Sequence, residues 1–250
     1  MNRPILKKLN YRLILIVAIT FVSLALNQAI AHDHVSILFR PPPEDEQPEE
    51  TEGAASRQTN RCAADPQISQ PTAAQDLKLT AIAPQGNYGL TTKERPNLWI
   101  YLPETSAKQA ILSIRKEGET IHWQQSVDLR SQAGITGIEL AENAPALEIG
   151  SNYQWAVILV CSDRPNPNDP VVTSWIKRIE ARDSQSSSSS ELAKASTYAQ
   201  QGIWYDTIDI LISEKSSQNN WQDLWNKYLE SANLNRFTDR PVVENPLRSR

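Results

Sequence analysis

Two histidines near the start of the chain have the spacing best suited to metal chemistry. His32 and His34 flank Asp33, directly after Ala31. If the chain is cleaved after Ala31, the new amine, two backbone nitrogens and the imidazole of His34 could bind Cu(II) or Ni(II) in a square plane. Short motifs of this kind give many false matches. We therefore expect no metal, and keep the pair as a weak candidate beside the alternative of a polar stub.

The third histidine, His122, lies on the polar side of a predicted strand. A general base needs a nucleophile and an orienting group nearby, and the sequence shows neither beside His122. The chain also lacks a Gly-x-Ser-x-Gly elbow, a metalloprotease motif and a phosphate-binding loop. We interpret His122 as an exposed strand residue and expect neither an enzyme nor a bound cofactor. Two carboxylates that meet only in the folded chain are the alternative that leaves an enzyme open.

A proline-containing loop offers oxygen ligands for Ca²⁺ at Asp163, Asn166, Asn168 and Asp169. It lacks the ligand spacing, the glycine and the final glutamate of a helix–loop–helix calcium site. We interpret this loop as a rigid turn.

Seven tryptophans are the remaining candidates for binding. Trp99 and Tyr101 lie on one face of a predicted strand whose other face is also apolar. They form either an exposed platform that stacks on sugar rings or a face covered by the helical tail. We favour the covered face, because exposed aromatic patches are uncommon in monomers. The tail has three tryptophans that could cover the strand or dock a partner, namely Trp204, Trp221 and Trp225.

The first 31 residues have the order of parts found in a secretory signal peptide. Four basic residues precede an apolar run over residues 13–26, and Ala29-Ile30-Ala31 follows as a small-x-small cleavage sequence. The run is shorter than the roughly 20 residues of a transmembrane helix. We predict cleavage near Ala31, export to the periplasm or the extracellular space, and no transmembrane span afterwards.

The net charge of the chain limits the classes of partner that it can bind. Loss of the four basic residues of the signal would change the net charge from −4 to −8, which disfavours nucleic acid as a partner.

Two cysteines in an exported chain predict one disulfide between Cys62 and Cys161, with two buried free thiols as the alternative. The bridge would close a loop of about 100 residues and stabilise the fold by roughly 4–5 kcal/mol.

The middle of the chain predicts a mainly β domain over residues 62–180. Turn signals separate short runs of alternating apolar residues, and helices of 10–15 residues do not alternate with them. About seven strands and a central strand bearing Trp155 are typical of a β-sandwich of the immunoglobulin or fibronectin type III kind. The predicted strands cover residues 77–83, 97–102, 110–116, 120–129, 135–140, 153–161 and 171–179.

Linkers and helices surround this domain. A proline-rich and acidic linker over residues 32–61 predicts an extended, solvated spacer, and a serine-rich linker covers residues 181–190. After this second linker, apolar residues recur at every third or fourth position. This spacing predicts a helical hairpin broken at Gly202 and one further helix within residues 191–236. This appendage is too small for a large core of its own, so we expect it to pack on the sandwich or on a partner. Residues 237–250 are predicted to be a loose tail.

Several short motifs follow one another along the chain, among them Phe39-Arg40-Pro41-Pro42-Pro43, Tyr153-Gln154-Trp155 and Gly202-Ile203-Trp204-Tyr205-Asp206. The chain resembles an exported family of domains of unknown function found mainly in photosynthetic bacteria, with a proline-rich start and two spaced cysteines. The resemblance covers residues 37–230; it supports the domain limits and the Cys62–Cys161 pairing, and implies no catalytic residues. The tail distantly resembles one tetratricopeptide hairpin, whereas a solenoid needs about three repeats.

These observations predict a non-catalytic exported module that binds another envelope or exported protein. The alternative is a glycan-binding β-sandwich that holds polysaccharide on Trp99 and Tyr101. An enzyme without a recognisable catalytic set is the third hypothesis.

Overall fold

The computed structural model describes residues 36–43, 48, 61–62, 64–65, 77–129, 132–181, 190–243 and 246–248. The predicted signal segment, residues 1–31, lies outside them, and so does most of the predicted linker. None of the helices in the described ranges is long and apolar enough to cross a membrane.

The larger sheet has five strands in the order β2-β8-β7-β4-β5. Its centre is β7, which buries Tyr153, Trp155, Val157 and Leu159 on one face, as their period-two spacing predicts. Neighbouring strands are antiparallel except for β2 and β8. The strands are β2 (Tyr88–Thr91), β4 (Gln109–Lys116), β5 (Trp123–Asp128), β7 (Asn152–Val160) and β8 (Val171–Arg178).

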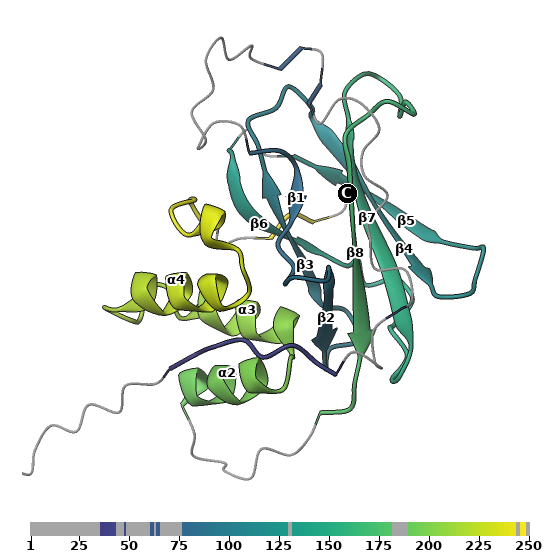
Figure 1. Ribbon diagram of the computed structural model, residues 1–250. Coiled ribbons are helices and arrows are strands. Elements are labelled where there is room, and N and C mark those ends of the chain that lie inside the picture. Colours follow the sequence, from purple (N-terminus) through teal and green to yellow (C-terminus); the bar gives the residue numbers. More distant parts are fainter. Residues whose placement is uncertain are drawn as a thin grey trace, which may run out of the picture. The chain divides into compact units, whose positions relative to one another are not determined.

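The smaller sheet has the order β1-β3-β6, formed by β1 (Thr80–Ala81), β3 (Asn97–Leu102) and β6 (Gly134–Glu139). Gln125 of β5 links the two sheets, because its side chain donates to the carbonyl of Glu139 and accepts from the amide of Ala141, both at 2.9 Å. The prediction of a mainly β fold with two sheets and a helical end is confirmed (Figure 1).

Strand β2 was not predicted, and it positions the helices. It has only four residues, too few for a clear alternation, and it runs parallel to β8. A Cβ atom at Gly89 would lie 2.8 Å from the Cβ of Trp204. Glycine therefore lets the first turn of the second helix lie directly against this strand.

Three α-helices and a short 3₁₀ helix follow the sheets, and the three α-helices were predicted. The Ser190 hydroxyl accepts from the amide of Ala193 and caps the first helix. Gly202, with φ +74°, allows the sharp reversal into the second helix, which is buried on most of its surface. The helices are α2 (Glu191–Gln200), α3 (Trp204–Ser213), α4 (Trp221–Ser231) and η2 (Asn235–Phe237).

Part of the C-terminal segment is bonded to β6, which corrects the expectation of a loose tail. The amide of Ile135 donates to the carbonyl of Pro241, and the amide of Leu247 donates to the carbonyl of Gly137, both at 2.8 Å. Leu247 is buried. The outer edge of β6 has unpaired backbone groups until this segment binds them, and the sequence carries no local signal for that pairing.

Candidate binding cleft

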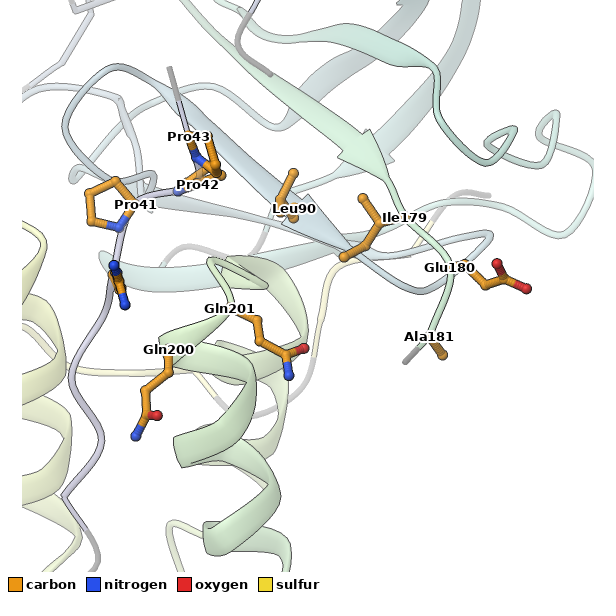
Figure 2. Close-up of a pocket in the computed structure, with 10 residues that line it drawn as sticks. Pro41, Pro42, Pro43, Leu90, Ile179, Glu180, Ala181, Gln200 and Gln201 are labelled. Carbon is orange, nitrogen blue, oxygen red and sulfur yellow. The ribbon is translucent and has the colours of Figure 1, made fainter. Parts of the chain in front are cut away.

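A cleft of about 690 Å³ lies beside the proline-rich segment, among the described residues. We call residues 36–43 the arm. The arm prolines 41–43 form one side of the cleft, and Glu180 and Ala181, after β8, form the other. Figure 2 shows Leu90 of β2 and Ile179 between these two sides. Leu90 is buried, so the cleft has an apolar floor that rests on the larger sheet.

Polar and charged side chains surround this floor. Gln200 and Gln201, at the C-terminal end of α2, line the cleft on the side of the helices (Figure 2). Arg40 adds a positive charge on the arm side, and Glu180 a negative charge on the side of β8. The cleft therefore combines apolar contact, amide groups that both donate and accept, and one charge of each sign.

The arm is seated on the helices, which corrects the expectation that this part of the linker is a solvated spacer. Ile37 and Phe39 are buried. The ring of Phe39 packs edge-on against Trp204, with 5.0 Å between ring centroids. Figure 1 shows the arm running between α2 and the other helices toward β2. The acidic part of the linker lies largely outside the described residues.

A network of two aspartates fixes α3 against β2 and β3. Asp206 is buried and accepts hydrogen bonds of 2.6 Å from the hydroxyls of both Thr91 and Thr92. Asp209, one turn later, binds the Lys93 ammonium at 2.6 Å and also accepts from Asn97 at 3.1 Å. These contacts hold the helical layer in place on the sheets, and with it one wall of the cleft.

Burial changes the pKa of groups within this layer. Burial raises the pKa of Asp209, although Lys93 acts in the opposite direction. Burial lowers the pKa of Lys93, but the Asp209 carboxylate more than offsets this, so its pKa is raised overall. The Tyr205 hydroxyl accepts from the indole of Trp155 at 2.9 Å and donates to the carbonyl of Trp175 at 3.2 Å. Its burial raises the pKa of Tyr205 to about 12. Hydrogen bonds or ion pairs with neighbouring residues account for the positions of Asp209, Lys93 and Tyr205.

Trp99 and Tyr101 do not form an exposed platform. Trp99 is 1% exposed and Tyr101 7% exposed. The Trp99 indole donates to Asp209 of α3, and the Tyr101 ring contacts Phe237 of η2 with 5.5 Å between centroids. The helical layer covers this face of β3, so a sugar ring cannot stack there.

The three tryptophans of the helices are also buried in this structure. Trp204 stacks on Tyr228 and donates to the carbonyl of Ile82 at 2.8 Å. Trp221 and Trp225 stack on each other and are buried. These tryptophans instead pack in the helical layer that covers the sheets, because aromatic side chains bury a large area where the layers meet.

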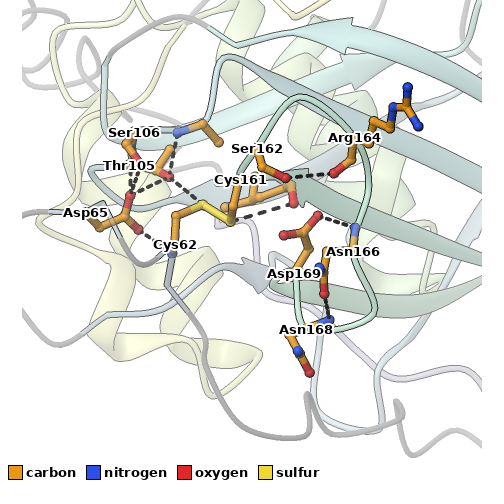
Figure 3. Close-up of a disulfide and its surroundings, with 12 residues drawn as sticks. Cys62, Asp65, Thr105, Ser106, Cys161, Ser162, Arg164, Asn166, Asn168 and Asp169 are labelled. Carbon is orange, nitrogen blue, oxygen red and sulfur yellow. Dashed lines mark hydrogen bonds between the residues drawn. A yellow bond between two sulfur atoms is a disulfide. The ribbon is translucent and has the colours of Figure 1, made fainter.

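The predicted disulfide between Cys62 and Cys161 is present, with 5.2 Å between the Cα atoms (Figure 3). A buried carboxylate supports it. Asp65 accepts from the amide of Cys62 at 2.7 Å and from the amide of Ser106 at 2.6 Å. The covalent bond and these hydrogen bonds together attach the segment before β1 to β7 and to the β3–β4 connection.

The weaker metal and catalytic candidates have ordinary surroundings where the structure describes them. In the loop at residues 163–169, Asp169 accepts from the amide of Asn166 and the Asn166 side chain accepts from the amide of Asn168, as in a closed turn (Figure 3). His122 is exposed and precedes β5. His32 and His34 lie outside the described residues. Within the described ranges, no cluster of three or more histidine, cysteine or acidic side chains is arranged to hold a metal ion.

Sequence reasoning missed Asp206, Asp209 and the arm. The signal for the two aspartates was their position within an otherwise apolar helix, where a carboxylate needs a buried partner. The signal for the arm was the alternation that buries Ile37 and Phe39 but exposes Leu38. Both signals are short, and each acquires meaning only through partners far along the chain.

Comparison with known proteins gives one match. No curated protein and no solved structure matches the chain significantly. A family model described as Domain of Unknown Function (DUF928) matches residues 52–242, which span both sheets and the helical layer. The chain therefore belongs to the DUF928 family.

Proposed function

We propose that this protein is a non-catalytic, exported interaction module at the cell envelope, which binds an extended segment of another protein in the cleft. The composition of the cleft is the observation that carries the proposal. Its apolar floor is flanked by amide side chains and by opposite charges, the set of groups that an extended peptide can use at once.

The lining suggests the chemistry of the bound segment. Prolines lack a backbone N–H, so the arm side of the cleft accepts hydrogen bonds but cannot donate them from residues 41–43. Gln200 and Gln201 can pair with both backbone groups of a bound peptide. Arg40 would favour an acidic residue on the arm side, and Glu180 a basic residue on the opposite side.

Two further observations support action outside the cytoplasm. The first 31 residues have the pattern of an export signal, and the fold contains a disulfide that closes a long loop.

Site-specific photo-crosslinking in intact cells tests the proposal. A photo-reactive amino acid replaces Gln201 in the cleft, and in a matched control it replaces exposed Gln124 on β5. We expect one protein to crosslink at position 201 but not at 124, with the attachment mapped by mass spectrometry to an extended segment. The crosslink should be lost when Ile179→Asp places a charge in the floor. Equal crosslinking at both positions, or a crosslink that survives Ile179→Asp, would show that the cleft is not the binding site.

A further inference from the structure

The arm is held like a bound peptide rather than like an element of the core. Exposed and buried side chains alternate over residues 36–40, where Ile37 and Phe39 are buried and Leu38 is 49% exposed. Pro42 is buried three positions after Phe39. The arm belongs to neither sheet and to no helix. Its contacts are those that an extended ligand makes with a groove: side chains in pockets at alternate positions and a few backbone hydrogen bonds.

Those hydrogen bonds come from two different helices. The amide of Arg40 donates to the carbonyl of Ala199 in α2 at 3.0 Å. The amide of Phe39 donates to the hydroxyl of Ser231 in α4 at 2.8 Å, and the hydroxyl of Ser196 donates to the carbonyl of Ser36 at 2.7 Å. The arm therefore lies along a groove whose two sides are α2 and α4.

The base of this groove is aromatic. Trp204 and Tyr228 stack with 4.8 Å between centroids, and Phe39 contacts both rings. At the end of the groove, a Cβ atom at Gly202 would lie 3.0 Å from the Cδ of Pro42. Without the arm, a contiguous aromatic surface would face water, which is costly. The groove therefore needs an occupant of this shape.

We infer that the α2–α4 groove is a binding site for extended segments with an aliphatic residue, an aromatic residue two positions later and a proline three positions after that, and that the arm is its built-in competitor. The occupant in trans is such a segment of a partner protein. The seated arm supplies the recognition pattern: Ile37 and Phe39 fill the groove, and Pro42 lies over Gly202. The groove and the cleft share the arm, since prolines 41–43 form one side of the cleft. Binding in the groove does not depend on a ligand in the cleft, but displacement of the arm would remove that side of the cleft.

Because the arm and the groove belong to one chain, the arm competes with any segment that is added in trans. A tethered segment acts at an effective concentration of order mM for short flexible linkers. A free segment of equal quality therefore binds weakly to the intact chain. Weakening the arm should expose the same groove to a ligand added in trans.

A labelled peptide with the sequence of residues 36–43 tests this on the full chain by fluorescence anisotropy. The arm variant is Phe39→Ala, and the matched control is Leu38→Ala, whose side chain points away from the groove. We expect the peptide to bind Phe39→Ala at least ten-fold more tightly than wild type, and Leu38→Ala to behave as wild type. A second peptide, with alanine in place of its phenylalanine, should not bind.

A second measurement keeps the inference testable if Phe39→Ala does not fold. Hydrogen exchange of the Phe39 and Arg40 amides in the wild-type chain should become at least several-fold faster with excess peptide, because the displaced arm loses its bonds to Ser231 and Ala199. A folded Phe39→Ala chain that binds no peptide at mM concentration would overturn the inference. Unchanged exchange in the wild-type chain would overturn it equally.

Discussion

The indole Nε1 of Trp99 in β3 donates a hydrogen bond of 2.9 Å to Oδ1 of Asp209 in α3. This contact joins the outer face of the smaller sheet to the helical layer across 110 positions of the sequence. It explains why an aromatic face that could have been a sugar platform is part of the interior. Asp209 also binds Lys93, so a single carboxylate connects the helix to two different parts of the sheet region.

Replacing Trp99 by phenylalanine tests this contact. Trp99→Phe keeps an apolar ring but removes a donor from a buried carboxylate, so we expect a loss of roughly 1–3 kcal/mol in the free energy of unfolding. Trp123→Phe is the matched control, since Trp123 is only half-buried at the start of β5. Urea denaturation of both variants measures the difference. Equal losses would mean that ring size, not the hydrogen bond, determines the effect.

The raised pKa of Asp209 predicts a pH dependence with a definite sign. The folded protein holds the Asp209 proton more tightly than the unfolded chain, where the pKa is about 3.9. The contribution of this group is therefore complete below about pH 3.9 and is lost as the pH rises through the higher pKa of the folded state. The free energy of unfolding of the wild type minus that of Asp209→Asn should decrease between pH 3.5 and pH 7.

Asp223→Asn is the control for this pH series. Asp223 pairs with Lys227 on the exposed side of α4, with a carboxylate that is 69% exposed. Surface pairs of this kind contribute little to stability. The free energy of unfolding of Asp223→Asn should therefore differ from that of wild type by less than about 1 kcal/mol. A wild-type advantage over Asp209→Asn that grew with pH would contradict the assignment.

The disulfide should account for a large part of the stability. Cys62 and Cys161 are 99 positions apart, so removing the bond frees a long loop in the unfolded chain. We expect Cys62→Ala/Cys161→Ala to lose roughly 4–5 kcal/mol in denaturant titrations. A reducing agent should destabilise the wild type by a similar amount and leave the double variant unchanged. A wild-type chain insensitive to complete reduction would show that the Asp65 network alone holds this segment.

Leu247→Ser should release the C-terminal segment from β6. The buried Leu247 side chain fixes the segment whose carbonyls accept from the Ile135 and Glu139 amides. Hydrogen exchange at these two amides should become at least ten-fold faster, because opening the edge exposes them to water. Arg248→Ser is the control, as its side chain is 78% exposed. If exchange rose equally in both variants, general loosening of β6 would explain it.

Local pattern predicted most of the elements correctly. Alternation over residues 97–102 and 153–161 matches β3 and β7 closely, and the change of period after residue 190 matches three helices. The even number of cysteines and the predicted export of the chain together predicted the Cys62–Cys161 bond. These features depend on residues near one another, or on a simple count, and so they are readable in order along the chain.

The sequence by itself determined the fold class, the helical end and the disulfide. Only the tertiary structure decided that Trp99 and Tyr101 are covered, that the arm lies in the α2–α4 groove, and that β2 pairs in parallel with β8. The reason is that a strand apolar on both faces, or a short segment with alternating apolar residues, can be buried by any suitable surface. Which surface does so depends on contacts between residues far apart in the sequence, and local periodicity carries no record of them.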